Sequence, residues 1–173
     1  MALKIFKRWK AKYGVRVFGS KAAKTVMESD ERNGNNDSFD NGFLLDRLGG
    51  PQVLECLVEA FLDRVLLDDK LMDFFKDTDL RVLTLHQKRF FTMAFTKIPE
   101  SVNVMISIKN HHKHLFAQGL HEGHFDLVVQ HLTAAMEALE VDKAIMTEAA
   151  RIVLPLRVIF EEGAKEAKLA QDL

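Results

Sequence analysis

The amino-acid sequence predicts an all-helical protein. Four stretches between residues 51 and 160 place apolar residues three or four positions apart, as on one face of an amphipathic α-helix, and runs that alternate apolar and polar residues are almost absent. The chain has 173 residues, 47% of them hydrophobic and 28% charged, which suits one domain with a short extension. Four amphipathic faces must bury against one another, so we expect a single small helical domain.

The four predicted helices follow one another from residue 51. The first begins at Pro51, because proline is favourable in a first helical turn, and its apolar face runs to about residue 65. The second covers about residues 80–95 and the third about 125–139. The fourth begins near residue 142 and contains Pro155, which is expected to bend it.

The N-terminal part of the chain has a different composition. Residues 1–27 carry eight Lys and Arg and no acidic residue, whereas the remainder carries 16 Lys and Arg and all 25 Asp and Glu. Apolar residues recur at helical spacing within this arm, so we expect it to contact a membrane surface or to target an organelle, with docking on its own domain as the alternative. Residues 28–42 are rich in turn formers and are expected to form a flexible linker. The folded domain is then expected at residues 43–162, followed by a tail at 163–173.

Several classes of protein are excluded by composition and missing motifs. The single cysteine, Cys56, leaves no disulfide framework and no thiolate zinc site. The chain lacks a secretory signal and an apolar run long enough to span a membrane, so we expect a cytoplasmic protein. It also lacks the motifs of nucleotide binding and of acyl transfer. Eight charges on one arm do not make a basic domain, so no nucleic-acid partner is expected, and the protein is expected to be a monomer.

All seven histidines lie between residues 86 and 131, which draws attention to metal binding. The segment His121-Glu122-Gly123-His124 is similar to a zinc protease motif, but its histidines are spaced i,i+3 instead of i,i+4. His111 and His112 are adjacent, so on a helix their side chains point about 100° apart and they cannot both face one ion. A zinc site is therefore not expected here, and at most one of this adjacent pair would be a metal ligand.

Five segments together resemble a group I truncated haemoglobin. They are residues 45–50 (LDRLGG), 61–66 (FLDRVL), 74–75 (FF), 86–91 (HQKRFF) and 124–128 (HFDLV), and their order and spacing carry the resemblance. It covers roughly residues 43–160. The family implies a two-over-two helical sandwich around one b-type haem (iron protoporphyrin IX), whose iron binds O2, NO and CO.

The resemblance implies an iron-binding histidine on a short helix ahead of the His-Phe-Asp run. The family's pattern of an aliphatic residue, three residues, histidine, two residues and leucine fits His112, with Ile108 and Leu115 against the haem. Counting back from Phe125 in relatives with a longer loop selects His111 instead. We expect His112 to be the proximal iron ligand and keep His111 as the alternative.

The second predicted helix is expected to supply the distal side of the haem. Leu83, His86 and Gln87 are spaced i, i+3 and i+4 and therefore share one face. Several relatives carry a histidine or lysine at the place of His86 that binds the iron, so the resemblance implies bis-histidyl coordination when no gas is bound. The alternative is that His86 points to a haem propionate or to water.

Leu62 departs from the family. Many relatives have a tyrosine at this place, whose hydroxyl donates to bound O2, and leucine has no donor. The loss costs about 1.5 to 3 kcal/mol, or about 10- to 100-fold in retention of O2, unless Gln87 or His86 substitutes. Further haem contacts implied by the resemblance come from Phe61, Phe75, Phe90 and Arg89, the last, or its neighbour Lys88, pairing with a propionate.

Three functions follow from this reading. The first is reversible binding of O2, NO or CO, as a store, carrier or sensor. The second is a haem enzyme, a nitric oxide dioxygenase or a peroxidase-like catalyst, which would need a separate reductase because the chain holds no reductase domain. The third is a haem-free helical interaction module tethered by its basic arm. We favour the first.

Overall fold

The computed structural model describes residues 42–172, and the predictions for the N-terminal arm and most of the linker concern residues outside this range. All regular elements within it are helical, which confirms the predicted all-helical class. They are α3 (Leu44–Leu48), α4 (Gly50–Val65), α5 (Leu80–Ala94), α6 (Val104–Phe116), α7 (Glu122–Ala138), α8 (Lys143–Val153) and α9 (Arg157–Gln171), with 3-10 turns η2 (Met72–Phe75) and η3 (Leu154–Leu156).

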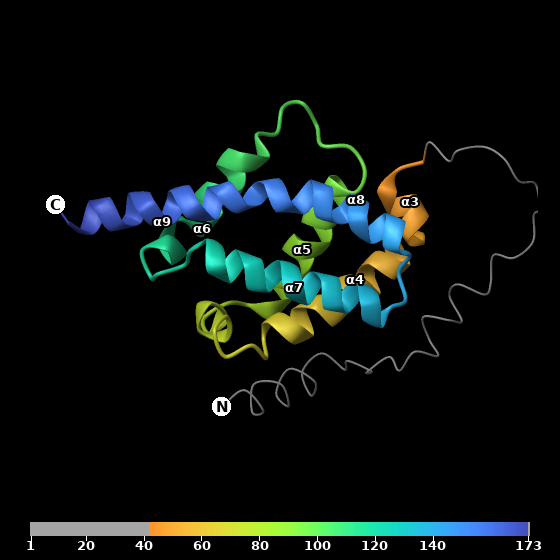
Figure 1. The fold of residues 1–173 in the computed structure, drawn as a ribbon, viewed down its shortest axis with the longest axis horizontal. Helices are drawn as coiled ribbons and strands as arrows, with labels where there is room; N and C mark the ends of the chain where they lie inside the picture. The colour runs from red at the N-terminus through yellow and green to blue at the C-terminus, as the bar shows by residue number, and fades with distance from the viewer. Residues whose placement is uncertain (1–41, 173) are drawn as a thin grey trace, which may run out of the picture.

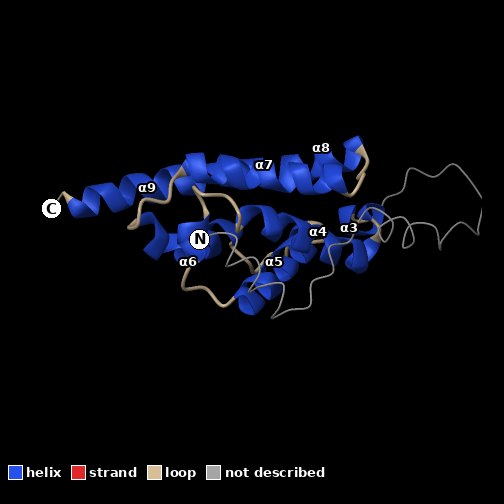
Figure 2. Ribbon diagram, turned by 90° about the horizontal axis from the view of Figure 1, so that it is seen from below, coloured by secondary structure: helices blue, strands red, loops and turns tan. Residues whose placement is uncertain are grey.

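The helices form two layers (Figures 1 and 2). Helices α7, α8 and α9 make one layer, and α3, α4, α5 and α6 make the other. The contacts that join the layers are those of α4 with α7, of α6 with α9 and of α3 with α8. The two layers therefore bury the amphipathic faces against each other, as the sequence pattern predicts.

Local signals explain where the helices begin. Gly49 has a φ of 110°, in the left-handed region that favours glycine, and it both ends α3 and precedes α4. Pro51 lies in the first turn of α4, as expected. Asp79, Asn103 and Asp142 each accept a hydrogen bond from a backbone N–H in the first turn of α5, α6 and α8, respectively.

Pro155 divides the fourth predicted helix into α8, the 3-10 turn η3 and α9. A proline lacks the N–H that would bond to the carbonyl one turn earlier, so the tighter turn forms at this point. After it, α9 continues without a break to Gln171. The helix therefore crosses the expected boundary between the globin domain and a tail at residue 163.

The core consists of apolar side chains from both layers. The largest fully buried side chains include Leu57 and Val58 of α4 and Ile159 of α9. Leu71 and Phe95, from the segments between helices, belong to the same group. Burial of such a side chain contributes about 1.5 to 3 kcal/mol. Among residues 42–172, no charged or polar residue is buried as a whole. No helix in this range combines the length and hydropathy needed to cross a membrane.

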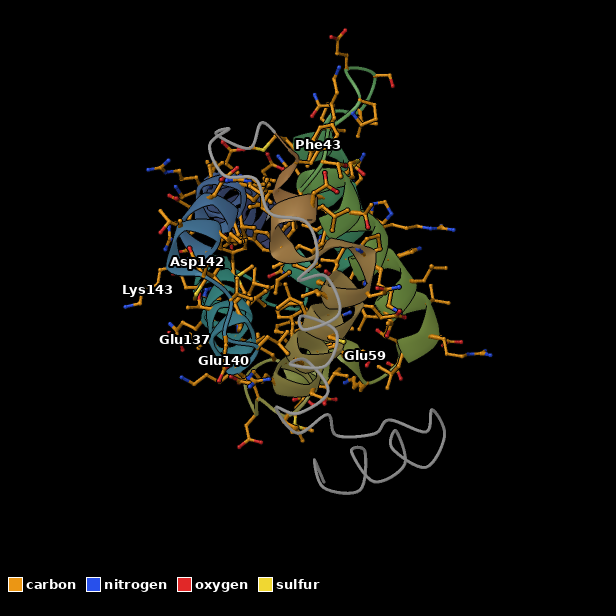
Figure 3. All side chains as sticks on the ribbon, turned by 90° about the vertical axis from the view of Figure 1, so that its right-hand side faces the viewer. Phe43, Glu59, Glu137, Glu140, Asp142 and Lys143 are labelled. Atoms are coloured by element: carbon orange, nitrogen blue, oxygen red, sulfur yellow. The ribbon has the colours of Figure 1, made fainter. Side chains whose placement is uncertain are left out.

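Charged side chains lie on the outside of the layers. Figure 3 shows the end of the molecule where α7 turns into α8, with Glu137, Glu140, Asp142 and Lys143 extending outward. Glu140 has a φ of 56°, so this turn is tight enough to need a left-handed residue. Glu59 of α4 is half-buried instead, and burial, ahead of its charged neighbours, raises the pKa of its carboxyl above the ordinary value.

Candidate functional site

A histidine of α5 and a histidine of α6 lie close to each other. The ring centres of His86, on α5, and His111, on α6, are 6.4 Å apart, and the ring planes are inclined by 88°. The Nδ1–H of His111 donates to the carbonyl of Ser107, one turn earlier, at 2.8 Å. Its Nε2 therefore remains free to act as an electron-pair donor. The side chain of His86 makes no hydrogen bond within residues 42–172, so both imidazoles can bind a metal ion.

Most of the expected apolar residues are only partly buried. Phe75, Leu83, Phe90, Ile108 and Leu115 each pack against the core and remain partly open on another side. Partly open apolar side chains of this kind are surface that a flat apolar cofactor can cover. Val82 extends this surface in a way that the sequence analysis missed. It lies one turn before His86, and 49% of its surface is exposed.

His112 lies in a different environment from His111. Its ring packs against Phe160 of α9, with ring centres 5.3 Å apart, and against Phe116, at 6.4 Å. Its Nδ1–H donates to the carbonyl of Ile108 at 2.8 Å. Burial is the main cause that lowers the pKa of His112, so the ring stays neutral near pH 7. His112 therefore contacts α9, whereas its neighbour His111 lies on a different side of α6.

The contact between α6 and α9 determines how α6 is rotated about its axis. The ring of Phe116 lies over Gly163 of α9, where a Cβ atom would come within 2.3 Å of it. Lys109, on the same side of α6, pairs with Glu166 of α9 at 2.6 Å. Lys109, His112 and Phe116 are spaced i, i+3 and i+7 and form one face. With that face held on α9, His111 is turned toward α5.

The other expected site residues divide into three groups. Phe61 and Leu62 are buried in α4, and Phe61 meets Phe91 edge to face with ring centres 5.9 Å apart. Gln87 is half-buried beside His86. Lys88 pairs with Glu55, whereas the exposed Arg89 has no ion-pair partner among the residues that the structure describes. Of these two cations, Arg89 is the one that remains available for an anionic group.

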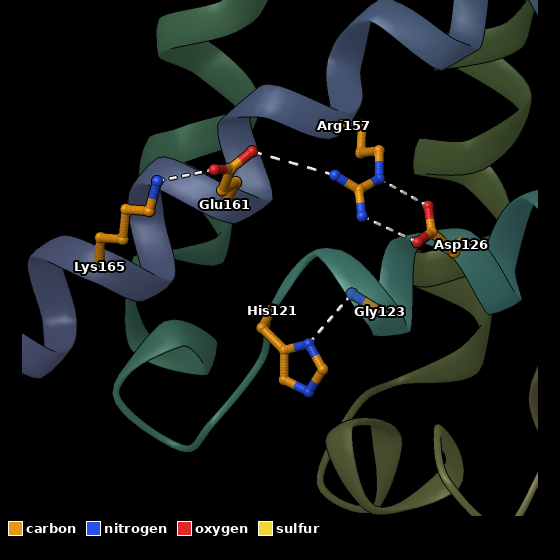
Figure 4. Close-up of polar contacts among 6 residues, drawn as sticks. All are labelled: His121, Gly123, Asp126, Arg157, Glu161 and Lys165. Atoms are coloured by element: carbon orange, nitrogen blue, oxygen red, sulfur yellow. Dashed lines mark hydrogen bonds and ion pairs between the residues drawn. The ribbon is translucent and has the colours of Figure 1, made fainter.

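Figure 4 shows an ion pair between α9 and α7 and a second ion pair within α9. Arg157 of α9 donates to both carboxylate oxygens of Asp126 on α7, at 2.9 and 3.1 Å. Lys165 donates to Glu161 at 2.6 Å. The fork of arginine fits a carboxylate with two parallel hydrogen bonds, and this exposed pair links α7 to α9 at the surface.

Comparisons with known proteins identify the fold. A family model described as bacterial-like globin matches residues 43–161. The group 1 truncated hemoglobin GlbN of Synechocystis sp. is 33% identical over 110 residues, which are 63% of this chain and 87% of that protein. The chain belongs to the group 1 truncated haemoglobins. This confirms the family inferred from the sequence.

Solved structures of truncated haemoglobins agree with this assignment. The 2/2 hemoglobin of Synechococcus sp. PCC 7002, solved in the cyanomet state with covalently attached heme, superimposes with a TM-score of 0.62 at 29% identity, over 69% of this chain and 98% of that one. THB4 of Chlamydomonas reinhardtii gives a TM-score of 0.62 at 28% identity, over 68% and 94% of the two chains. These likenesses confirm the two-over-two helical fold of this truncated haemoglobin.

Proposed function

We propose that this truncated haemoglobin holds one haem b between α5 and α6, with His86 and His111 as the two axial ligands of its iron. Membership of the family implies a haem protein that binds diatomic gases, and the iron supplies that chemistry when haem is bound. The observation that carries the proposal is the pair of neighbouring imidazoles, 6.4 Å apart between ring centres. Haem fits these residues, because it needs axial nitrogen donors and apolar side chains against both faces.

The spacing of the two rings suits one metal ion between them. An imidazole nitrogen lies about 2 Å from a bound metal ion, and the ring centre roughly 1 Å further, so two rings on opposite sides have centres about 6 Å apart. His111 meets this condition with His86. His112 does not face α5, because its ring packs on Phe160. The geometry thus favours His111 over His112 as the proximal ligand, although the aliphatic-histidine-leucine pattern favours His112.

His86 has two roles in this proposal. With haem bound, His86 would hold the iron at rest, and it would have to move away before O2, NO or CO could bind. The apparent affinity for gas is then reduced by the fraction of molecules in which His86 has left. Gln87, half-buried next to it, is the side chain placed to donate a hydrogen bond to the gas, because Leu62 has no donor. Arg89 is placed to pair with a propionate.

The test is the visible absorption spectrum of the full chain loaded with haem, in the ferric and the dithionite-reduced state, before and after CO. We expect a six-coordinate low-spin ferrous spectrum that CO replaces. His86→Leu should convert it to a five-coordinate spectrum that still binds CO. His111→Leu should also abolish the six-coordinate spectrum, whereas His112→Phe, which keeps an aromatic ring against Phe160, should retain it.

The outcomes separate the alternatives. Loss of the six-coordinate spectrum in His112→Phe, with retention in His111→Leu, would return the proximal role to His112. An unchanged spectrum in His86→Leu would remove His86 from the iron. Failure of the wild-type chain to retain haem would overturn the proposal and leave the haem-free interaction module.

A further inference from the structure

The first turn of α7 is capped by two histidines in a reciprocal arrangement. The backbone N–H of Gly123 donates to Nδ1 of His121 at 3.0 Å, as Figure 4 shows. The backbone N–H of His121 donates to Nδ1 of His124 at 3.2 Å. The centres of the two rings are 4.1 Å apart, and their planes are inclined by 57°. This is the pattern of a capping box, in which serine or threonine and glutamate ordinarily supply the oxygen acceptors.

The other side-chain caps among residues 42–172 use oxygen. Asp79 accepts from Arg81 N–H at 2.9 Å, Asn103 from Ile106 N–H at 3.0 Å and Asp142 from Ala144 N–H at 2.7 Å. Carboxylates and amides keep their acceptor oxygens throughout the pH range from about 5 to 8. Imidazole titrates within that range. Among residues 42–172, the cap of α7 is therefore the side-chain cap whose acceptors change with pH near neutrality.

The chemistry of imidazole makes this cap dependent on protonation. Each Nδ1 accepts a hydrogen bond only while it carries no proton, so both rings must be neutral with the proton on Nε2. A proton on either Nδ1 removes one acceptor. It also places a positive charge at the N-terminus of a helix, where the helix dipole is unfavourable to cations, and next to the second ring. Proton uptake and capping thus exclude each other.

The surroundings of the pair favour the neutral state at His124. Burial is the main cause that lowers the pKa of His124 from its ordinary value of 6.5, and the neighbouring His121 and Lys70 act in the same direction. Asp68 and Glu122 oppose them. Phe74 covers the ring edge to face with centres 5.0 Å apart. A folded-state pKa below the ordinary one means that the stabilisation is present above pH 6.5 and is lost as the pH falls through the lowered pKa.

The glycine between the two histidines permits the arrangement. A Cβ atom at position 123 would lie 2.7 Å from Cε1 of the His121 ring, so a larger residue would displace that ring from the cap. The segment His121-Glu122-Gly123-His124 therefore has a structural use for each histidine and for the glycine. Its i,i+3 spacing is that of an N-cap residue and the third residue of the helix.

We propose that His121 and His124 form a proton-binding site that uncaps α7 as the pH falls below neutrality. The site lies directly after the end of α6, where Leu120 N–H donates to the carbonyl of Leu115 at 2.9 Å and Gly119 N–H to that of Phe116 at 3.0 Å. Uncapping at His121 loosens this connection and with it the helix that carries His111. Proton uptake at the cap of α7 is thereby linked to the retention of haem. The link to haem rests on the proposed function, whereas the uncapping does not.

The test uses nuclear magnetic resonance on the 15N-labelled full chain between pH 8 and pH 5. At pH 8 both rings should show the Nε2–H tautomer. On acidification the backbone amides of His121 and Gly123 should shift and lose roughly five- to thirtyfold of their protection from hydrogen exchange, after correction for the intrinsic rate. The amides of Arg81, Ile106 and Ala144, under oxygen caps, serve as controls and should not respond in this way.

A double variant isolates the cap. His121→Ser combined with His124→Glu installs an ordinary capping box whose acceptors keep their capacity over this range. The pH response at residues 121–123 should disappear. Haem loss to an excess of a haem-scavenging protein should accelerate on acidification less in the double variant than in the wild type.

Different results overturn different steps. An Nδ1–H tautomer at pH 8, or the same pH response in the double variant, would refute the proton-binding site. If the amides respond to pH but acidification accelerates haem loss equally in the wild type and the double variant, the link to the helix that carries His111 is refuted. A chain that binds no haem but shows the titration would refute the proposed function and leave the proton-binding site intact.

Discussion

Gly163→Ala tests whether the close contact of α6 with α9 supports the fold. A Cβ atom at this position would lie 2.3, 2.5 and 2.6 Å from three carbons of the Phe116 ring. Ordinary van der Waals contact begins at 3.4 Å, so the ring would have to withdraw by about 1 Å. It cannot move freely, because Phe116 is 5% exposed and its ring also contacts Phe160 and His112.

Two effects of opposite sign determine how much Gly163→Ala changes the unfolding free energy. Overpacking of a well-packed core costs about 1 to 3 kcal/mol. Alanine stabilises a helix interior by about 1 kcal/mol relative to glycine. We therefore expect a net loss of up to about 2 kcal/mol of unfolding free energy, together with a displacement of α6 and hence of His111.

Urea unfolding of the full chain measures this loss. The midpoint should fall with little change in the slope, because the surface exposed on unfolding is nearly the same. Phe116→Leu in the Gly163→Ala background removes part of the ring that the new methyl group meets. The double variant should therefore lose less unfolding free energy than the sum of the losses in the two single variants. Additive losses in the double variant would show that the helices do not meet as described.

Two further predictions concern Asp68 and Leu62. Burial raises the pKa of the Asp68 carboxyl, but hydrogen bonds from His131 and from Lys70 N–H outweigh it, so the net pKa is lowered and stability is lost as the pH falls through that value. His131→Asn should therefore lower the urea midpoint at about pH 5, by the equivalent of a few tenths to about 1 kcal/mol, and the difference should vanish near pH 2; equal midpoints at pH 5 would refute the pairing. Leu62→Tyr should slow O2 dissociation about 10- to 100-fold in stopped-flow measurements, because it supplies a hydroxyl donor, whereas Leu62→Phe, which lacks the hydroxyl, should leave the rate unchanged.

The sequence predicts α4, α5, α7 and the stretch that forms α8 and α9, since their apolar periodicity is a local property, whereas periodicity does not predict α6 (Val104–Phe116). The face of α4 is buried as expected, those of α5 and α7 are buried in part, and Pro155 interrupts the last helical stretch where a missing N–H requires it. The five-residue α3 and the turn η2 are too short to show a period. They form because Gly49 and the packing of the core end and position them, and these causes are not local.

The adjacent histidines show where local reasoning ends. His111 and His112 both donate from Nδ1 to a carbonyl four residues earlier, at 2.8 Å, so this hydrogen bond does not distinguish the two histidines. The difference arises from Phe160 and Gly163 on α9, some 50 residues further along the chain. The histidine pair at the start of α7 was within reach of sequence analysis. Its i,i+3 spacing ahead of an apolar helix is a capping signal, which the comparison with zinc motifs obscured.

The length of α9 has a consequence for any attempt to define the smallest working unit of this protein. The likeness to the family model ends at residue 161. Beyond that point, Gly163 of α9 packs under the ring of Phe116, and Glu166 forms an ion pair with Lys109. The side-chain amide of Gln171 donates a hydrogen bond to the carbonyl of Ala117 at 3.2 Å. A fragment cut at the edge of the likeness would keep both of the proposed axial histidines and lose these three anchors of α6. About the last three turns of α9 thus hold in place the helix that carries the proposed iron ligand.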